Sequence, residues 1–468
     1  MFFFIIVTSL YFVLPYNRRW LLLLISSCYF YMAFVPIYIL ILGFTIVIDY
    51  FAGRYIESAE GKRRKLFLIF SLIANIGVLA VFKYYNFINH NFSFLMHGFG
   101  FTNPIPYLSI LLPIGLSFHT FQAMSYTIEV YRGRQKAERH FGIYSLYVMF
   151  YPQLVAGPIE RPQNLLHQFR EKYDFEYDRV VEGLKQMLWG FFKKLVIADR
   201  LAIYVNAVYN NPEQHNGTTF VLATIFFAFQ IYCDFSGYSD IAIGAAKVMG
   251  FKLMTNFNRP YFARNISEFW KRWHISLSTW FKDYLYISLG GNKVSIPRWY
   301  CNLLLVFLVS GLWHGANWTY IIWGALNGFY LVLAIITQGL RNKFTILTGI
   351  EKLPKLNHIL QILITFMLSC FAWIFFRANN VTDALLIIKK IFLLSGTLYI
   401  GDFQQLLYCI AGIIFLIIIE LRHEYFDHSI LPFKTNYWLK EQMAYALLIV
   451  LILLIGVFDG GQFIYFQF

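Results

Sequence analysis

The chain has 468 residues, of which 58% are hydrophobic, 20% aromatic and only 14% charged. Soluble domains usually carry about 25% charged residues, so this composition excludes an ordinary soluble protein. The long Leu-, Ile- and Phe-rich blocks do not alternate in polarity, which excludes a transmembrane β-barrel. We therefore predict an all-α polytopic membrane protein.

The net charge is +14, from 39 Lys and Arg against 25 Asp and Glu. Retention of basic loops in the cytoplasm explains such an excess, and attraction of an anionic substrate to that face is a second explanation. No basic segment stands apart from the apolar stretches, so we expect no nucleic-acid partner. The five cysteines are scattered singly, which argues against disulfides or a zinc site.

Apolar stretches long enough to be candidate spans recur along the whole chain. We expect roughly eleven true crossings, with the remaining stretches re-entrant or interfacial. The candidates lie near residues 1–14, 20–34, 36–52, 66–82, 107–126, 143–157, 186–207, 218–248, 299–313, 317–337, 358–376, 404–420 and 441–458.

Basic residues predict the orientation of the first spans. No basic residue precedes the first apolar stretch, and Arg18 and Arg19 follow it without an evident cleavage site, so we expect an uncleaved helix with its N-terminus outside. The segment EGKRRK (60–65) is strongly basic and is expected in the cytoplasm. Counting two spans back places Arg18 and Arg19 on the same side, and YRGRQKAERH (131–140) also falls inside.

Two polar segments interrupt apolar stretches. In YPQLVAGPIERPQNLL (151–166), Gly157-Pro158 and Arg161-Pro162 predict irregular backbone, either a tight turn or a segment that lines a cavity. In FFAFQIYCDFSGYSDIAIG (226–244), Gln230 and Asp234 stand one helical turn apart. A carboxylate there needs partners, so the segment is either a polar contact between helices or a group that orients a histidine.

The segment EFWKRWHISLSTWFKDYL (268–285) predicts one amphipathic interfacial helix, with Asn265 as its N-cap and Glu268 three residues on. His274 falls on its aromatic face. The ring is either hydrogen-bonded inside an aromatic cluster or turned into a protein cavity. The basic side chains would attract lipid phosphates or the phosphates of a nucleotide-bearing donor: Lys271, Arg272 and Lys282, with Arg264 nearby.

A histidine interrupts the apolar stretch that contains SGLWHGANW (310–318). Gly311 and Gly315 form one G-x-x-x-G pattern, and Gly324 and Gly328 form another, so we expect helices to approach closely there. His314 would then face protein, as a structural ring or as a general base. Desolvation favours the neutral ring, in which one nitrogen is a proton acceptor.

The sequence gives little support to metal chemistry. No nucleotide-binding glycine loop, H-E-x-x-H or G-x-S-x-G motif is evident. His274 and His314 have no acidic or cysteine companion at metal-ligand spacing, so we expect no metal.

Six blocks in order resemble the bacterial membrane-bound O-acyltransferase (MBOAT) family, in the branch of the alginate O-acetyltransferase membrane subunits. They include LVAGPIERP, the R-W-H-I-S-L-S-T-W block with His274 and the W-H-G-A-N-W block with His314. The matching stretches are residues 112–133, 154–162, 229–251, 257–291, 310–324 and 463–468.

The resemblance implies an MBOAT fold, in which helices surround a central tunnel. It implies one membrane domain over 1–468, with N-terminal helices (1–100), a catalytic core (101–330) and C-terminal helices (331–468). His314 corresponds to the usual catalytic histidine of the family and His274 to its second histidine. We expect the neighbouring polar or aromatic residues to position substrate: Asp234, Gln230, Tyr238, Asn317, Trp313 and Ser310.

The resemblance further implies an O-acyltransferase of the bacterial inner membrane, with no bound cofactor and cytoplasmic acetyl-CoA as donor substrate. The acetyl group would pass through the membrane to an extracytoplasmic polysaccharide. Because no external domain is evident in the sequence, we expect a separate SGNH-type acyltransferase as partner. His314 would act as general base, or would carry the acyl group itself. The rival hypotheses are a transporter or channel for polysaccharide or lipid-linked sugar, and a non-catalytic scaffold.

Overall fold

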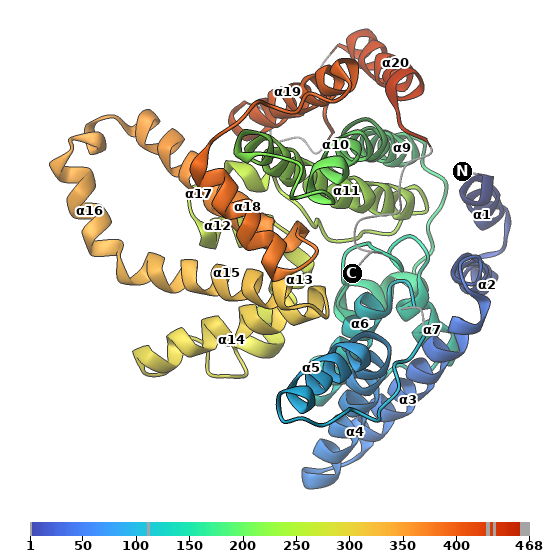
Figure 1. Ribbon diagram of the computed structural model, residues 1–468. Coiled ribbons are helices and arrows are strands. Elements are labelled where there is room, and N and C mark those ends of the chain that lie inside the picture. The colour runs from blue at the N-terminus through green and yellow to red at the C-terminus, as the bar shows by residue number, and fades with distance from the viewer. Residues whose placement is uncertain (1, 110–112, 427–430, 434–436, 459–468) are drawn as a thin grey trace. The chain divides into compact units, whose positions relative to one another are not determined.

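The computed structural model describes residues 2–109, 113–426, 431–433 and 437–458. These residues form helices and connecting loops, and none of them forms a strand (Figure 1). The helices are α1 (Phe2–Val13), α2 (Tyr16–Met32), α3 (Ile39–Ser58), α4 (Gly61–Leu79), α5 (Tyr85–Gly98), α6 (Leu116–Tyr131), α7 (Phe141–Met149), α8 (Pro162–Leu165), α9 (Tyr177–Phe191), α10 (Asp199–Tyr209), α11 (Gly217–Val248), α12 (Ile266–Arg272), α13 (Ile275–Trp280), α14 (Ile296–His314), α15 (Trp318–Ile336), α16 (Gln338–Leu347), α17 (Pro354–Arg377), α18 (Val381–Leu393), α19 (Phe403–Tyr425) and α20 (Trp438–Ile455).

Within the described ranges, 8 helical segments are long and apolar enough to cross a membrane, which confirms a multi-pass all-α protein. We expected about eleven crossings, and that number stays a prediction. The span expected at 107–126 is displaced, because its helix begins only at Leu116. The stretch expected at 143–157 is helical only to Met149, since the Gly-Pro-rich turn follows. The eight segments are Pro36–Ser58, Gly61–Gly98, Gly217–Val248, Ile296–His314, Trp318–Ile336, Pro354–Arg377, Phe403–Tyr425 and Trp438–Ile455.

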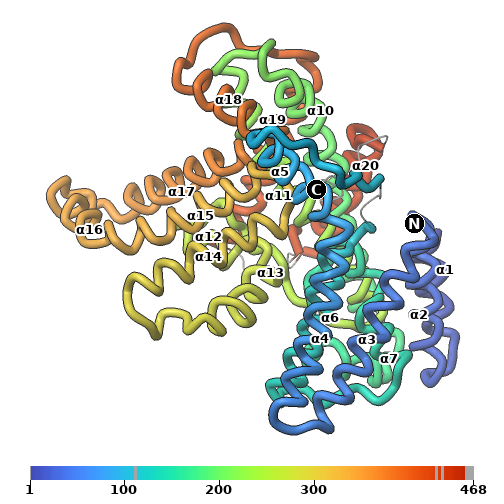
Figure 2. Tube along the Cα trace, turned by 60° about the horizontal axis from the view of Figure 1, so that its bottom comes forward, coloured from blue at the N-terminus to red at the C-terminus, as the bar shows by residue number. Residues whose placement is uncertain are grey.

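The helices pack into two compact units. The first unit comprises Met1–Met187 and Ile241–Met254. Within it α3, α4 and α6 lie side by side (Figures 1 and 2). Asp49 of α3 is fully buried and accepts hydrogen bonds from Ser71 and Asn75 of α4, so a polar contact joins these apolar helices. The prediction of a single domain in three parts stays a prediction.

The second unit comprises Leu188–Asp240 and Thr255–Phe468 and holds both histidines singled out in the sequence. Its core is strongly aromatic, and Trp273, Trp323 and Trp373 are among its fully buried side chains. Tilted and edge-on ring pairs dominate, which are the arrangements that aromatic quadrupoles favour.

Glycines set the spacing of α14 and α15, which lie side by side in the second unit. A Cβ atom on Gly311 would clash with the carbonyl oxygen of Tyr320, and one on Gly324 would clash with that of Phe307. The close approach predicted from the two G-x-x-x-G patterns is therefore confirmed.

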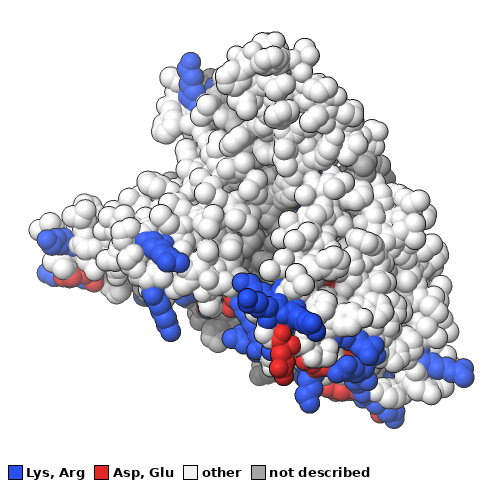
Figure 3. All heavy atoms as spheres, turned by 90° about the horizontal axis from the view of Figure 1, so that it is seen from below, with Lys and Arg blue, Asp and Glu red and all other residues white. Residues whose placement is uncertain are grey.

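Uncharged side chains cover most of the face drawn in Figure 3. Many of its Lys, Arg, Asp and Glu side chains lie toward the lower border of the view, and further Lys or Arg side chains lie at the left and upper edges. An uncharged face of this kind suits contact with lipid, where an ionised side chain is costly.

The close contact of α14 and α15 predicts that a larger side chain at Gly324 lowers stability, whereas one at an open glycine does not. Gly324→Val should lower the free energy of unfolding by about 2 kcal/mol or more, because the new side chain meets backbone that cannot move aside. Apparent melting temperature in detergent measures the effect. Gly339→Ala in α16 is the control, because its Cβ would have nothing within 4 Å. Equal melting temperatures for the two variants would contradict this packing.

Candidate active site

The predicted helix over 268–285 is wrong as one continuous element. α12 ends at Arg272, His274 adopts the left-handed conformation with φ 43°, and α13 begins at Ile275. The reason is tertiary: residues of the preceding loop run beside the break and bind its backbone. The amide of Ile275 donates to the Asn256 carbonyl at 2.9 Å, and the amide of Asn258 donates to the Arg272 carbonyl at 2.9 Å.

The start of α12 agrees with the sequence. The Asn265 side chain accepts a hydrogen bond from the backbone amide of Glu268 at 2.9 Å, so the predicted N-cap is confirmed. The Glu268 carboxylate accepts a hydrogen bond from the backbone amide of Arg264 at 2.9 Å. Together these bonds satisfy two amides and fix where the helix begins.

Asn256 fixes the orientation and the tautomer of His274. Its Oδ1 accepts hydrogen bonds from the Ser276 amide at 3.2 Å and from the Ser276 hydroxyl at 2.9 Å. A backbone amide only donates, so this atom is the amide oxygen. His274 Nδ1 lies 3.2 Å from the same oxygen and therefore carries the proton, which leaves Nε2 as the nitrogen with a lone pair.

His274 is fully buried among aromatic rings. The Phe235 ring meets it edge-on with centroids 4.6 Å apart, and the Trp313 ring lies 6.1 Å away. Burial lowers the pKa of His274 to about 3, so the ring is neutral at physiological pH. Its contacts match the interpretation of a hydrogen-bonded ring in an aromatic cluster, and its role in turnover stays a prediction.

His314 is the last residue of α14 and is 4% exposed. Its ring meets Trp313 and Trp323 edge-on, each with centroids 4.9 Å apart, and Phe376 at 5.4 Å. The side chain thus faces protein, as the sequence predicted.

The Trp313 ring packs against both histidines. Its ring contacts His274 with centroids 6.1 Å apart and His314 with centroids 4.9 Å apart. The fold of the second unit therefore brings together two residues that the sequence separates widely. Trp313 is one of the positions that the sequence predicted to handle substrate.

Two further predicted positions shape this junction. Asn317 caps α15 by accepting from the Thr319 amide at 3.1 Å, and its side-chain amide donates to the Asn379 carbonyl at 3.1 Å. Ser310 is buried in α14, one turn before His314. Asn317 therefore holds the turn after His314, and substrate contact at either residue stays a prediction.

The polar residues of α11 meet cations that the sequence analysis missed. Asp234 pairs with Lys194 at 2.6 Å, and Lys194 also pairs with Asp199 at 2.7 Å. Lys193 pairs with Asp240 at 2.5 Å. The sequence does contain a signal for these ion pairs. Two lysines lie inside the apolar stretch 186–207, and buried ammonium groups require carboxylate partners.

Gln230, Asp234 and Tyr238 follow one another at one-turn intervals along α11. Gln230 and Asp234 are buried, and Tyr238 is partly buried. The ion pair of Asp234 agrees with the interpretation of a polar contact between helices. Positioning of substrate by these three residues stays a prediction.

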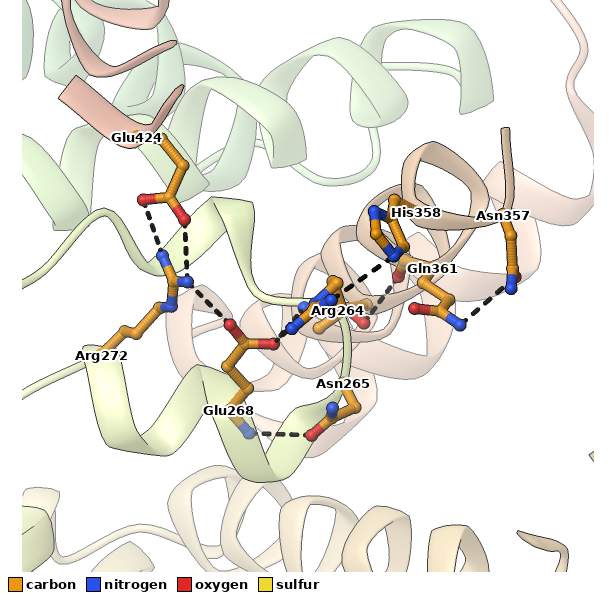
Figure 4. A network of polar contacts seen from close by, with 9 residues as sticks. Arg264, Asn265, Glu268, Arg272, Asn357, His358, Gln361 and Glu424 are labelled. Carbon is orange, nitrogen blue, oxygen red and sulfur yellow. Dashed lines mark hydrogen bonds and ion pairs between the residues drawn. The ribbon is translucent and has the colours of Figure 1, made fainter. Parts of the chain in front are cut away.

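The predicted donor-binding cations fall into two groups. Arg272 donates to Glu424 at 2.9 and 3.0 Å and to Glu268 at 2.7 Å, while Arg264 lies 3.6 Å from Glu268 (Figure 4). Lys271 and Lys282 are exposed. The attraction of donor phosphates stays a prediction, and the structure favours the two lysines for it because both arginines already face carboxylates.

Comparison with known proteins identifies the family. The model of the membrane-bound O-acyltransferase family matches residues 139–377, a range that includes His274 and His314. The chain is 41% identical to the probable alginate O-acetylase AlgI of Pseudomonas aeruginosa over 378 residues, which cover 80% of this chain and 70% of that protein. It is 37% identical to the peptidoglycan O-acetyltransferase of Helicobacter pylori over 408 residues, 81% of this chain and 75% of that one.

A more distant match is the teichoic acid D-alanyltransferase of Bacillus subtilis, 28% identical over 279 residues, which cover 57% of this chain and 69% of that protein. The chain belongs to the membrane-bound O-acyltransferase family. It is a multi-pass membrane enzyme that transfers acyl groups to oxygen.

The neutral state of His274 predicts how stability depends on pH. An unfolded imidazole titrates near pH 6.5, whereas the folded ring stays neutral down to about pH 3. The unfolded chain therefore binds an extra proton below about pH 6.5, and this site costs about 2 kcal/mol of stability at pH 5.

Unfolding of the detergent-solubilised protein at pH 8 and pH 5 tests this dependence. The wild type should lose more stability between the two pH values than His274→Asn, which keeps a hydrogen-bonding group but does not titrate. The comparison between the two proteins cancels the contributions of all other groups. An equal loss in both would mean that His274 is charged or solvated in the fold.

Proposed function

We propose that the enzyme passes acetyl groups from cytoplasmic acetyl-CoA to an extracytoplasmic polysaccharide, with His314 as the general base. One observation carries this proposal: two buried imidazoles, one at the break between α12 and α13 and one at the end of α14, pack against the same indole, Trp313, in a chain of the O-acyltransferase family. A buried imidazole that is neutral supplies a proton acceptor without the cost of burying a charge.

In the proposed step, a neutral His314 takes the proton from an acceptor hydroxyl. The oxygen attacks the thioester carbonyl, a C–O bond forms, and the C–S bond breaks as the thiolate leaves. The proton on His314 then passes to the thiolate, which restores both the ring and the free thiol. A histidine-bound acyl intermediate is the alternative route to the same products.

His274 has a different proposed role. Because its pKa is lowered to about 3, it holds no proton to donate from Nε2 at neutral pH. Its Nδ1 carries the proton that faces Asn256, so Nε2 carries the lone pair and acts as an acceptor. We assign to it the orientation of an acceptor hydroxyl or of His314 through such a bond.

The substrate class rests on the relatives. Those with alginate, peptidoglycan and teichoic acid in their names all act on cell-surface polymers. A polysaccharide outside the cytoplasm is therefore the proposed final acceptor, and a separate SGNH-type acyltransferase the proposed partner. In this proposal the chain lies in the bacterial inner membrane with its N-terminus outside, and a tunnel connects donor and acceptor.

Replacement of His314 tests the general base directly. His314→Ala should lower acetyl transfer from labelled acetyl-CoA by 100-fold or more, in the range expected for loss of a general base. The assay uses membranes that contain the full-length protein and its partner, with protein abundance measured in the same samples.

His97→Ala is the matched control, since His97 is an exposed histidine of α5. This variant should transfer acetyl groups at the wild-type rate. If His314→Ala also keeps that rate at normal abundance, His314 is not the base.

A further inference from the structure

We propose that Glu424, near the end of α19, is a positioning residue for His274: it binds the two arginines that flank the loop holding the imidazole. This inference rests on the proposed role of His274 in acetyl transfer. Glu424 lies 152 positions from Arg272, and the sequence analysis did not single it out.

The Glu424 carboxylate binds two guanidinium groups. Its Oε2 accepts from Arg259 Nε at 2.7 Å and from Arg272 at 3.0 Å, and its Oε1 accepts from Arg272 at 2.9 Å (Figure 4 shows the Arg272 side). The bonds to Arg272 use two nitrogens and both oxygens, which is the bidentate geometry that fixes direction as well as distance. The Arg259, Arg272 and Glu424 side chains are 22%, 19% and 15% exposed, so solvent screens these charges only in part.

Both arginines lie next to the backbone that holds His274. Arg272 is the last residue of α12, and its carbonyl accepts from the amide of Asn258. Arg259 follows Asn258 directly. The loop that contains Asn256 and Asn258 thus makes all of these hydrogen bonds to residues 272–276. Arg259 follows this loop in the chain and Arg272 is bound to it, and Glu424 binds both arginines.

Two residues of this region have a strained backbone: Arg259 directly follows the loop, and His274 lies at the break between α12 and α13. Arg259 has φ 45° and His274 has φ 43°, both in the left-handed region, which is strained for a residue other than glycine. Such strain persists only where surrounding contacts over-determine the conformation. Glu424 supplies such contacts to Arg259 itself and to the residue two before His274.

Removal of the negative charge of Glu424 should therefore loosen the loop of Asn256 and Asn258 without removing any group that touches substrate. With glutamine at 424, one oxygen and one amide face two guanidinium groups, and at least one guanidinium loses its charged partner. The His274 ring would then sample more orientations, which reduces the fraction of molecules with a correctly placed Nε2.

A double-mutant cycle tests the proposal, with acetyl transfer in membranes as the readout for Glu424→Gln, His274→Asn and the double variant. Glu424→Gln should lower transfer about 10-fold in the wild-type background and less than 2-fold when His274 is already asparagine. Glu351→Gln, at an exposed carboxylate, is the control and should have no effect in either background.

The outcomes separate this proposal from the proposed function. Equal losses in both backgrounds, or full activity of Glu424→Gln, would overturn the positioning role of Glu424. Full activity of His274→Asn would overturn the role of His274 and with it this inference. If Glu424→Gln does not accumulate, Arg272→Lys, which keeps the charge but not the bidentate geometry, should show the same dependence on His274.

Discussion

The hydrogen bonds of one buried amide, that of Asn256, determine the geometry of the candidate active site. Its carbonyl and side-chain oxygens accept hydrogen bonds from the amides of Ile275 and Ser276, so α12 ends at Arg272 and α13 begins at Ile275. The same side chain binds Nδ1 of the imidazole, and its amide nitrogen donates to Ser239 of α11. A helix break, a tautomer and a contact to α11 thus depend on one residue.

The neutral state of His274 follows from its burial. Aromatic rings surround His274 and His314, and glycines allow α14 and α15 to close over the second histidine. Charged groups are instead paired with one another elsewhere, as Asp234 is with Lys194 and Glu424 with two arginines. Within the described part of the second unit, aromatic rings therefore surround both histidines, whereas the carboxylates of Asp234 and Glu424 lie in ion pairs.

Local sequence signals were sufficient for part of this structure. The apolar stretches predicted the helical class, Asn265 predicted a helix start, and the glycine spacing around His314 predicted the α14–α15 contact. The break at His274 could not be predicted, because Arg-Trp-His contains no residue that disfavours a helix strongly. Its cause lies in a loop 16 to 18 residues earlier in the chain. The partners of Asp234 and Arg272 were missed for a related reason: long-range pairs leave no local pattern, although buried lysines do indicate that carboxylates must be near.

The central claim is that His274 and His314 act at one centre. Single-turnover acetyl transfer by His314→Gln, His274→Asn and the double variant tests it most directly, since residues that act as a unit are strongly non-additive. We predict that the double variant is no slower than the slower single variant. A double variant slowed by the product of the two single effects would contradict a shared centre.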